Sequence, residues 1–250
     1  GPGSGHLACG DSGDGRMSEA AEIVAAAERM LCAKNDLAGK KVLVTAGPTR
    51  EPVDPVRFLT NQSSGKMGYA VAEAARDRGA DVTLVTGPVA LAAPGGMTVV
   101  PVETTEDLYE AVTSRAAAQD VIVQAAAPAD FRAERAPQKI KKQGDEPLTL
   151  TLYPTRDVAA AVGAQKREGQ FIVAFAAETQ NLTENARKKL LKKNASLVVA
   201  NDVTRAGAGF GVDTNIASFV TAQGVRELPM MTKRELADKI LDEYVSGKNS

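Results

Sequence analysis

Short apolar runs alternate with helical patterns along most of this chain. Runs rich in β-branched residues predict buried strands at residues 41–46, 81–86, 99–102, 121–125, 171–175 and 197–200. Apolar residues at helical spacing predict helices at residues 64–78, 105–118, 182–193 and 233–245. Because the strands are short and apolar throughout, and helices separate most of them, the pattern indicates a mostly parallel sheet with helices on both faces.

Two segments depart from this pattern. Leucine and threonine alternate strictly over residues 148–152, which predicts a half-exposed strand. Residues 217–221 and 225–228 flank Gln223-Gly224, which predicts a hairpin. We therefore expect an α/β fold with a Rossmann-like, mostly parallel sheet with helices on both faces, and a β-hairpin or strand extension.

The N-terminal part of the chain lacks the alternation of strands and helices. Residues 1–5 read Gly-Pro-Gly-Ser-Gly, which is typical of an expression scar left by a cleaved tag. Residues 6–17 are rich in glycine and aspartate without periodicity, whereas residues 18–32 predict a helix with Ser18 as its N-cap. A short polar linker follows, so we expect the main domain to span residues 40–250.

Composition narrows the classes of function. The chain has 250 residues, of which 44% are apolar and 24% charged, as in ordinary globular proteins. A net charge of −1 gives no global field for nucleic acid or anionic lipid, and no apolar run approaches the roughly 20 residues that cross a bilayer. Two cysteines, Cys9 and Cys32, and a single histidine, His6, disfavour disulfide frameworks, zinc sites and histidine-dependent triads. We expect no nucleic-acid or membrane partner.

Candidate chemistry lies in loops that follow the predicted strands, because ligands bind at the carboxyl ends of strands in parallel sheets. The first loop reads Asn-Gln-Ser-Ser-Gly-Lys-Met-Gly over residues 61–68, directly before a helix. Small residues and a helix N-terminus let backbone N–H groups approach an anion. A capped helix start with a glycine for packing explains the same octet equally well.

The second loop reads Ala-Ala-Ala-Pro-Ala-Asp-Phe over residues 125–131. Consecutive small residues leave room for a flat ligand against the backbone, and Asp130 is suited to a ribose, an amide or Mg²⁺. Tight packing of strand against helix, with Asp130 as a helix N-cap, is the alternative. For this loop taken alone, the alternative is the more frequent arrangement.

Lysines gather in two further segments. Lys139, Lys141 and Lys142 lie in one loop, and Lys189 and Lys193 are four residues apart, which places them on one helix face. Both arrangements suit a polyphosphate. A solvated charge run and cations that complement a helix C-terminus are the alternatives. Since no G-x-x-x-x-G-K-[ST] motif occurs, the combination indicates a nucleoside-triphosphate site without a P-loop.

The assembled motifs resemble bacterial phosphopantothenoylcysteine synthetase over about residues 40–245. The motifs that carry the resemblance are residues 45–57, 61–68, 126–130, 139–142, 175–179 and 200–203. The resemblance implies a ligase of coenzyme A biosynthesis that joins 4′-phosphopantothenate to L-cysteine, with CTP as co-substrate and Mg²⁺ or Mn²⁺ as cofactor. It further implies a cytoplasmic location and a homodimer, with the β-hairpin or strand extension used in dimerisation.

The implied reaction has two steps. The acid's carboxylate attacks the α-phosphorus of CTP and releases pyrophosphate, and the cysteine amine then displaces CMP from the acyl-cytidylate. Such chemistry needs positioning and charge neutralisation more than a covalent nucleophile. A chain with clustered lysines and a single histidine suits this requirement.

By resemblance, Asn61 and Lys139 are the catalytic residues. Asn61 contacts the pantothenate and handles the acyl-cytidylate, whereas Arg57 reaches the substrate phosphate of the partner protomer. Lys139, Lys189 and Lys193 hold the triphosphate. Gln124, Ala125 and Ala126 offer backbone groups to cytosine. The other expected nucleotide contacts are Ser63, Gly65, Asp130, Arg156, Asp157, Val158, Ala159 and Phe175. Ala127 and Asp130 are expected to bind the acid substrate, and Asp130 the metal ion.

Upstream, residues 8–11 and 15–17 resemble the end of the flavin-dependent phosphopantothenoylcysteine decarboxylase that bacteria fuse to this synthetase. Cys9 matches the catalytic cysteine of that enzyme, but its flavin domain is missing from this sequence. We therefore expect residues 6–39 to be the decarboxylase tail and a linker helix, with no bound flavin and no decarboxylation. The full-length protein is expected to carry the decarboxylase domain.

Two other functions stay open from the sequence. A nicotinamide or flavin oxidoreductase shares the predicted fold, because one fold serves many chemistries. A non-catalytic regulatory module would bind CTP without releasing pyrophosphate. The absorbance of the purified protein and a pyrophosphate assay separate these functions from a ligase.

Overall fold

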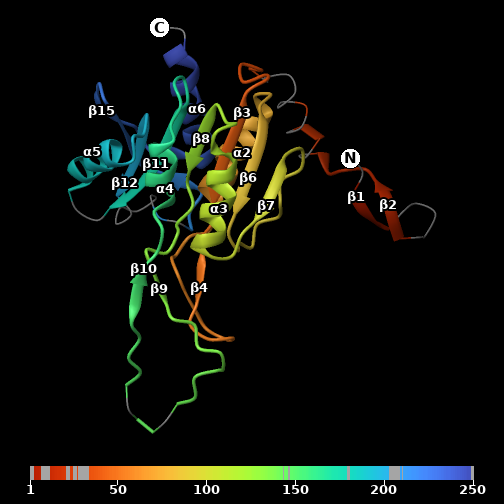
Figure 1. Cartoon of the computed structure of the whole chain (residues 1–250). Coiled ribbons are helices and arrows are strands. Elements are labelled where there is room, and N and C mark those ends of the chain that lie inside the picture. Colours follow the sequence, from red (N-terminus) through yellow and green to blue (C-terminus); the bar gives the residue numbers. More distant parts are fainter. Residues whose placement is uncertain are drawn as a thin grey trace.

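The computed structural model describes residues 3–6, 12–20, 23, 24, 27, 34–142, 144, 145, 147–178, 181–202, 209 and 211–248. Cys9, Cys32 and much of the helix predicted over residues 18–32 lie outside this part; Ala20, Ile23, Val24 and Ala27 are helical. The first two strands, β1 (Gly3–His6) and β2 (Ser12–Arg16), pair as an antiparallel hairpin that the sequence pattern did not predict. Figure 1 shows this hairpin apart from the main sheet.

Eight strands form the main sheet, in the order β15-β14-β12-β11-β8-β3-β6-β7 (Figure 1). The parallel strands are β3 (Lys41–Ala46), β6 (Asp81–Thr86), β7 (Thr98–Pro101), β8 (Val121–Gln124), β11 (Phe171–Glu178) and β12 (Leu197–Asp202). Their order is doubly wound, because the chain starts at β3, moves outward through β6 and β7, and returns to β8 on the other side of β3. The predicted α/β fold with a Rossmann-like sheet is confirmed.

Helices cover both faces of the sheet. They are α2 (Lys66–Asp77), α3 (Thr105–Ala116), α4 (Val158–Ala164), α5 (Leu182–Lys192) and α6 (Lys233–Lys248). Helices α2 and α6 pack on one face against a core that includes Val42 and Val44, whereas α3 and α4 pack on the other against Leu43. Adjacent strand residues thus point into different cores, which is why these strands are apolar throughout. The short, alanine-rich α4 is the helix that the pattern did not predict.

Glycines allow two helices to approach the backbone closely. A Cβ atom on Gly68 would lie 2.6 Å from the Cβ of Ala46 and 2.8 Å from the carbonyl oxygen of Thr45, so glycine lets α2 start directly over the end of β3. A Cβ atom on Gly163 would lie 1.9 Å from the carbonyl oxygen of Lys193, so α4 packs against the end of α5. The first contact places the N-terminus of α2 at the carboxyl end of β3.

The edge hairpin is confirmed. Strands β14 (Ala217–Thr221) and β15 (Gly224–Glu227) pair antiparallel, and β14 also pairs antiparallel with β12. Short flanking pairs join β4 (Arg50–Pro52) to β5 (Phe58–Thr60) and β13 (Thr214–Asn215) to β16 (Met231–Thr232). The pair β13–β16 returns the chain to the sheet edge where α6 begins.

A long arm projects from the body between two short strands (Figure 1). We define the arm as residues 134–151, between β9 (Phe131–Ala133) and β10 (Leu152–Pro154), which pair antiparallel. The strand predicted over residues 148–152 is wrong in extent, because only its last residue belongs to β10. Leu148 and Leu150 are exposed, at 57% and 36%. Strict alternation produced an apolar face, but within one chain no second surface covers it.

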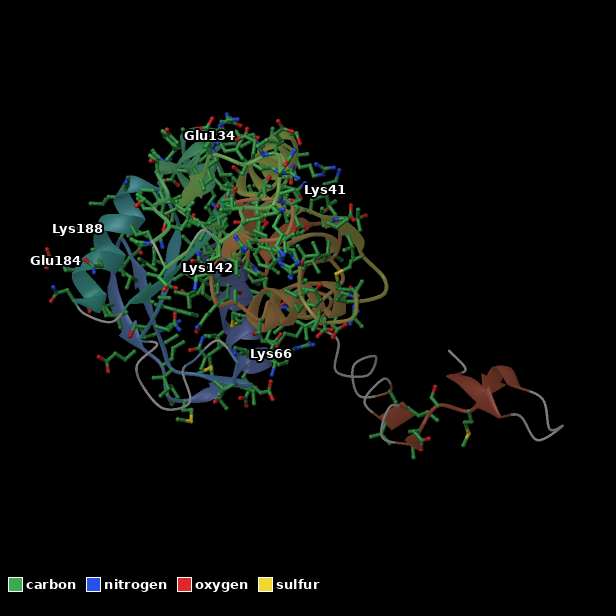
Figure 2. All side chains as sticks on the ribbon, turned by 90° about the horizontal axis from the view of Figure 1, so that it is seen from below. Lys41, Lys66, Glu134, Lys142, Glu184 and Lys188 are labelled. Atoms are coloured by element: carbon green, nitrogen blue, oxygen red, sulfur yellow. The ribbon has the colours of Figure 1, made fainter. Side chains whose placement is uncertain are left out.

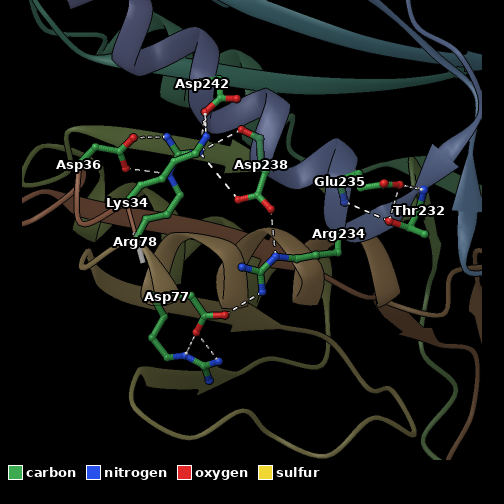
Figure 3. A network of polar contacts seen from close by, with 10 residues as sticks. Lys34, Asp36, Asp77, Arg78, Thr232, Arg234, Glu235, Asp238 and Asp242 are labelled. Atoms are coloured by element: carbon green, nitrogen blue, oxygen red, sulfur yellow. Dashed lines mark hydrogen bonds and ion pairs between the residues drawn. The ribbon is translucent and has the colours of Figure 1, made fainter. Parts of the chain in front are cut away.

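A network of ion pairs, which lies away from the arm, holds α2 and α6 together (Figure 3). Arg78, which ends α2, is 2% exposed and donates to both carboxylate oxygens of Asp36 at 2.8 and 2.7 Å. Its Nη1 also lies 2.9 Å from Asp242 of α6 and donates to the carbonyl oxygen of Asp238 at 3.0 Å. Arg234 extends the network to Asp77 at 2.7 Å. The segment that precedes β3 is thereby fixed to both helices.

In the described part of the chain, no helix combines the length and the hydropathy that crossing a bilayer requires.

Candidate functional site

A cleft of about 590 Å³ opens at the carboxyl ends of the parallel strands. Thr45 near the end of β3 and Gln124 at the end of β8 both line it, so the cleft lies at the point where the strand order reverses. All but two of the predicted site residues line this cleft: Asn61, Ser63, Gly65, Gln124, Ala125, Ala126, Ala127, Asp130, Arg156, Asp157, Val158, Ala159, Phe175, Lys189 and Lys193. The exceptions are Arg57 and Lys139.

The first loop enters the cleft as an open helix start. Gly65 is the N-cap residue of α2 with φ 77°, so it has no side chain to cap the first turn. A Cβ atom on Gly65 would approach Val89 to 2.8 Å, and Gly47 lies beside it. The hydroxyls of Ser63 and Ser64 accept from the N–H groups of Gly65 and Lys66, at 3.4 and 3.5 Å. These long bonds leave the helix start suited to a stronger anionic acceptor.

Asn61 joins the first loop to the second. Its Nδ2 donates to the carbonyl oxygen of Pro128 at 2.9 Å and to that of Ala127 at 3.3 Å. The backbone N–H of Ala127 in turn donates to the carbonyl oxygen of Gly47 at 2.9 Å. The carboxamide of Asn61 is thus fixed in the middle of the cleft, between the two loops.

Asp130 lies at the exposed rim of the second loop. The alternative that it caps a helix is wrong, because the strand β9 follows it and its carbonyl oxygen accepts from the N–H of Thr155 at 2.9 Å. Thr155 also donates through its hydroxyl to Ala129 at 2.6 Å. This loop is therefore held by backbone contacts, and the carboxylate of Asp130 faces the cleft rim.

The start of α4 forms the wall of the cleft on the α3 side. Asp157 is the N-cap of α4 and accepts from the N–H of Ala160 at 3.0 Å. Arg156 stacks on Tyr109, with 3.3 Å from its guanidinium carbon to the ring centroid, and donates to Glu106 at 2.6 Å. Val158 and Ala159 follow at the cleft surface. This wall of the cleft therefore combines the apolar side chains of Val158 and Ala159 with the guanidinium of Arg156.

Lys189 and Lys193 project from α5 into the same half of the cleft. Lys189 donates to the carbonyl oxygen of Phe175 at 2.6 Å. Lys193 is 8% exposed and donates to the carboxylate of Asp157. Burial raises the pKa of Asp157, but the hydrogen bond from Lys193 outweighs it and holds that pKa below its usual range. Two ammonium groups therefore stand where a polyphosphate would meet the helix start of α4.

Gln124 brings an unsatisfied donor into the cleft. It is 9% exposed, pairs in register with Thr45 and Ala174, and its buried Nε2 has no hydrogen-bond partner among the described residues. Leaving such a donor unpaired costs about 1–3 kcal/mol. A ligand that offers a carbonyl oxygen or ring nitrogen would remove this cost.

Arg57 and Lys139 lie outside the cleft lining. Arg57 donates to Asp54 at 3.3 Å and to the carbonyl oxygen of Ile140 at 3.1 Å, next to the exposed Lys139. Burial raises the pKa of Asp54, but backbone N–H groups of Val56, Ile140 and Arg57 outweigh it and hold the pKa below its usual range. Asp54 thus joins the base of the arm to the β4–β5 turn, and the two predicted residues come together there.

Sequence patterns missed several residues of the cleft. Asn201, Asn215 and Lys233 are buried and line it, together with Lys66. Lys66 belongs to the octet of the first loop, and Asn201 follows a predicted strand, so the sequence contained a signal that could have placed both residues in the cleft. Asn215 and Lys233 had none, because the antiparallel return of the chain through β13 and β16 brings them to this edge.

Within the described ranges, no group of three or more His, Cys, Asp or Glu side chains is arranged to hold a metal ion. Asp130 and Asp157 are acidic residues of the cleft lining. Mg²⁺ often uses one or two carboxylates together with substrate phosphates and water. The residues present fit a metal ion that arrives with a nucleotide.

Comparison with known proteins identifies the relatives of this chain. The profile of the family "DNA/pantothenate metabolism flavoprotein C-terminal domain" matches residues 37–247. The "Coenzyme A biosynthesis bifunctional protein CoaBC" of Bacillus subtilis is 49% identical over 98% of this chain, and that of Escherichia coli K12 is 45% identical over 98%. This chain spans 61% of the length of each.

A solved structure supports the same relationship. The crystal structure of the C-terminal domain of the CoaBC protein matches with a TM-score of 0.73 and 42% identity, over 86% of this chain and 98% of that one. These findings confirm the family resemblance drawn from the motifs. With a match over most of its length, the chain belongs to the family of DNA/pantothenate metabolism flavoprotein C-terminal domains.

Proposed function

We propose that this chain is a ligase of coenzyme A biosynthesis that joins 4′-phosphopantothenate to L-cysteine and uses CTP to activate the acid. The observation that carries the proposal is the cleft at the strand switch point, which is lined by Lys189, Lys193 and the open start of α2. The relatives at 49% and 45% identity are coenzyme A biosynthesis proteins, which supports the same conclusion.

The nucleotide occupies the half of the cleft beside α4 and α5. Lys189 and Lys193 neutralise the phosphates, and the buried amide of Gln124 meets the base. Val158 and Ala159 cover one side of the base, and Asp130 meets the ribose or the metal ion. Fixed charges and dipoles in such a site favour the charge that develops during phosphoryl transfer.

The acid lies along the first loop, with its carboxylate near Asn61. One carboxylate oxygen forms a bond to the α-phosphorus of CTP, while the bond to the bridging oxygen breaks and pyrophosphate leaves. The neutral cysteine amine then attacks the acyl carbon, the C–O bond to CMP breaks, and the amine loses one proton to solvent. Asn61, held by Ala127 and Pro128, orients the acyl group in both steps.

A divalent cation, Mg²⁺ or Mn²⁺, would supply charge neutralisation between phosphate oxygens when bound. Asp130 is the residue that would hold it at the cleft rim. No flavin is required by this cleft chemistry.

We further propose that the chain acts as a homodimer. The arm and its base expose apolar side chains that a monomer leaves in water, among them Leu148, Leu152, Phe131 and Phe58. Arg57 and Lys139 lie at the base of the same arm, so that a partner seated on it brings them toward the partner's cleft. We also expect a cytoplasmic location. In the full-length protein, we expect a flavin-dependent decarboxylase domain before residue 40.

A pyrophosphate-release assay tests the proposed function. With CTP and 4′-phosphopantothenate, the chain should release pyrophosphate once per site without cysteine, and continuously when cysteine is added. Binding of CTP without pyrophosphate release would instead support a regulatory module. Visible absorbance or reduction of a nicotinamide would support an oxidoreductase.

A further inference from the structure

A ring of hydrogen bonds closes around Ala129, near the end of the second loop. The N–H of Ala129 donates to the hydroxyl of Thr49 at 2.9 Å, and the carbonyl oxygen of Ala129 accepts from the hydroxyl of Thr105 at 3.2 Å. The two hydroxyl oxygens lie 2.9 Å apart. Both threonines are 1% exposed and Ala129 is buried beside them, so the ring lies in the interior of the protein.

The number of protons fixes the direction of each bond in this ring. A threonine hydroxyl has one proton to donate. The proton of Thr105 goes to the carbonyl oxygen of Ala129, which can only accept, so Thr49 must donate in the bond between the two hydroxyls. Each hydroxyl therefore donates once and accepts once, and the ring satisfies both backbone groups of Ala129.

The ring connects the second loop to two other elements of the fold. Thr49 lies between β3 and β4, next to Pro48, which forms a parallel bridge with Ala127. Thr105 is the first residue of α3, and its N–H donates to the buried carboxylate of Glu51 in β4 at 2.8 Å. A carboxylate at a helix N-terminus is favoured by the helix dipole, so Glu51 fixes the start of α3 against β4. Both hydroxyls of the ring are thus held from outside the loop.

The loop that this ring fixes is the loop that holds Asn61. The Nδ2 of Asn61 donates to the carbonyl oxygens of Ala127 and Pro128, the two residues that directly precede Ala129. The two threonines of the ring lie outside the lining of the cleft. They do not meet a ligand there, and any effect on the reaction must pass through the position of the loop.

We propose that Thr49 and Thr105 are positioning residues of the ligase reaction, which fix the second loop through Ala129 and thereby hold the carboxamide of Asn61 in place. This inference rests on the proposed function for the role of Asn61. Without the hydroxyl of Thr49, the buried N–H of Ala129 loses its acceptor, so the loop must shift to pair it elsewhere. Because a displacement of about 1 Å in a reacting geometry costs about a hundredfold in rate, a smaller shift already slows the reaction.

The test removes one hydroxyl and keeps the shape of the side chain. Steady-state pyrophosphate release with CTP, 4′-phosphopantothenate and cysteine is measured for the wild type, Thr49→Val and Thr49→Ser. We expect kcat to fall about tenfold or more in Thr49→Val, and to stay within about threefold of the wild type in Thr49→Ser, which keeps the hydroxyl. An unchanged kcat in Thr49→Val, or an equal loss in both variants, overturns the proposal.

The position of Asn61 is measured separately, without substrate. In ¹⁵N–¹H NMR spectra, the side-chain amide signal of Asn61 is assigned by its absence from Asn61→Ala. This signal should shift in Thr49→Val and keep its wild-type position in Thr49→Ser. A loss of kcat with an unmoved Asn61 signal would show that the ring does not act through this side chain, and it would overturn the proposal.

Thr105→Val is a milder variant that decides the matter if Thr49→Val does not fold. It leaves the acceptor of the Ala129 N–H in place, and the carbonyl oxygen of Ala129 keeps its bond of 2.6 Å from the hydroxyl of Thr155. We expect kcat to fall and the Asn61 signal to move in the same direction as in Thr49→Val, but by less. A wild-type kcat together with an unmoved Asn61 signal in Thr105→Val counts against the ring.

Thr113→Val is the matched control. Thr113 also lies on α3, about 12 Å further along the helix than Thr105, and its hydroxyl donates to the carbonyl oxygen of Tyr109 at 2.7 Å. A second control, Lys188→Met, removes the exposed ion pair with Glu184 that Figure 2 shows at the outer edge of the molecule. Both controls should keep the wild-type kcat and the wild-type Asn61 signal. Changes in Thr113→Val as large as those in Thr49→Val would mean that the ring has no special effect.

The two measurements separate this inference from the proposed function. If the wild type releases no pyrophosphate with CTP and the acid, the proposed function fails. The NMR comparison needs no substrate and still tests whether the ring holds Asn61. An Asn61 signal that moves in Thr49→Val and stays in Thr113→Val supports the ring, whereas a signal that stays in both overturns it.

Discussion

Arg78 and the lysines of the cleft are cations in the same fold, but they differ in their acceptors and in their access to the cleft. Arg78 donates to the carboxylate of Asp36 and contacts Asp242 (Figure 3). In the cleft, Lys189 donates to the carbonyl oxygen of Phe175, and Lys193 donates to the carboxylate of Asp157. A carboxylate brings an opposite charge to a cation, whereas a carbonyl oxygen accepts a hydrogen bond without bringing a full charge.

The difference separates a region built for stability from one built for binding. At Arg78 the opposite charges come from the chain itself, so the network contributes to folding without any ligand. The lysines of the cleft line an open cavity, and in the proposed function the phosphates of CTP bring further negative charge to them. We therefore expect substitutions in the first region to change the free energy of unfolding, and those in the second to change ligand affinity.

The largest effect is expected from Arg78→Met. Removing one partner of a buried ionic network costs about 3 kcal/mol, because the remaining carboxylates lose their donors. Urea unfolding should show this loss, while the affinity for CTP at low temperature stays within about twofold. Lys188→Met removes an exposed ion pair and should cost no more than about 0.5 kcal/mol. Equal losses in both variants would contradict the comparison.

A smaller effect, on binding, is expected from Lys189→Met. Loss of one ammonium group from the nucleotide half should weaken CTP about tenfold to a hundredfold, because a hydrogen bond to a charged group contributes about 1.5–3 kcal/mol. Unfolding free energy should change by less than about 1 kcal/mol. Isothermal titration calorimetry measures the affinity, with Lys188→Met, the neighbouring residue on the same helix, as control. A Lys189→Met protein that binds CTP like the wild type would place the nucleotide elsewhere.

Gln124→Leu should change stability and binding in opposite directions. The leucine removes a buried amide whose Nε2 lacks a partner in the described chain, so the ligand-free protein should gain about 1 kcal/mol. The same change should weaken CTP, because the base loses its donor. Thermal unfolding with and without CTP measures both effects: a higher Tm without ligand and a smaller rise on adding CTP. A lower Tm without ligand would mean that the amide is satisfied by the protein.

The smallest expected effect is a dependence of the free energy of unfolding on pH. The hydrogen bond from Arg78 holds the pKa of Asp36 below its usual range, against the opposing effect of burial. Because the pKa of Asp36 is lower in the folded than in the unfolded protein, its carboxylate stabilises the fold at pH values above the ordinary pKa of about 4. This contribution is lost as the pH falls through the pKa of Asp36 in the folded protein. The stability difference between the wild type and Arg78→Met should therefore narrow between about pH 5 and pH 3. A difference that stays constant over this range would exclude the contribution.

Much of the fold and part of the cleft followed from local sequence patterns. Strands such as residues 41–46 and 81–86 were predicted at their observed bounds, because a strand buried on both faces is apolar throughout. The octet at residues 61–68 predicted a helix start, but it left open whether a side chain caps this start; in the structure no side-chain cap is present at Gly65. The alternating leucines near residue 150 led to a strand prediction that is wrong in extent. Alternation creates an apolar face, but it does not supply the surface that would cover this face.

The sequence by itself determined the order of strands and helices, the family, and the residues of the cleft that follow parallel strands. Only the tertiary structure decided that Lys233 and Asn215 join this cleft, that Arg78 closes an ion network with Asp36 and Asp242, and that Gln124 keeps an unpaired donor. The physical reason is distance along the chain. Periodicity and capping act over a few residues, whereas these contacts join residues that lie far apart in sequence and meet only when the sheet has formed.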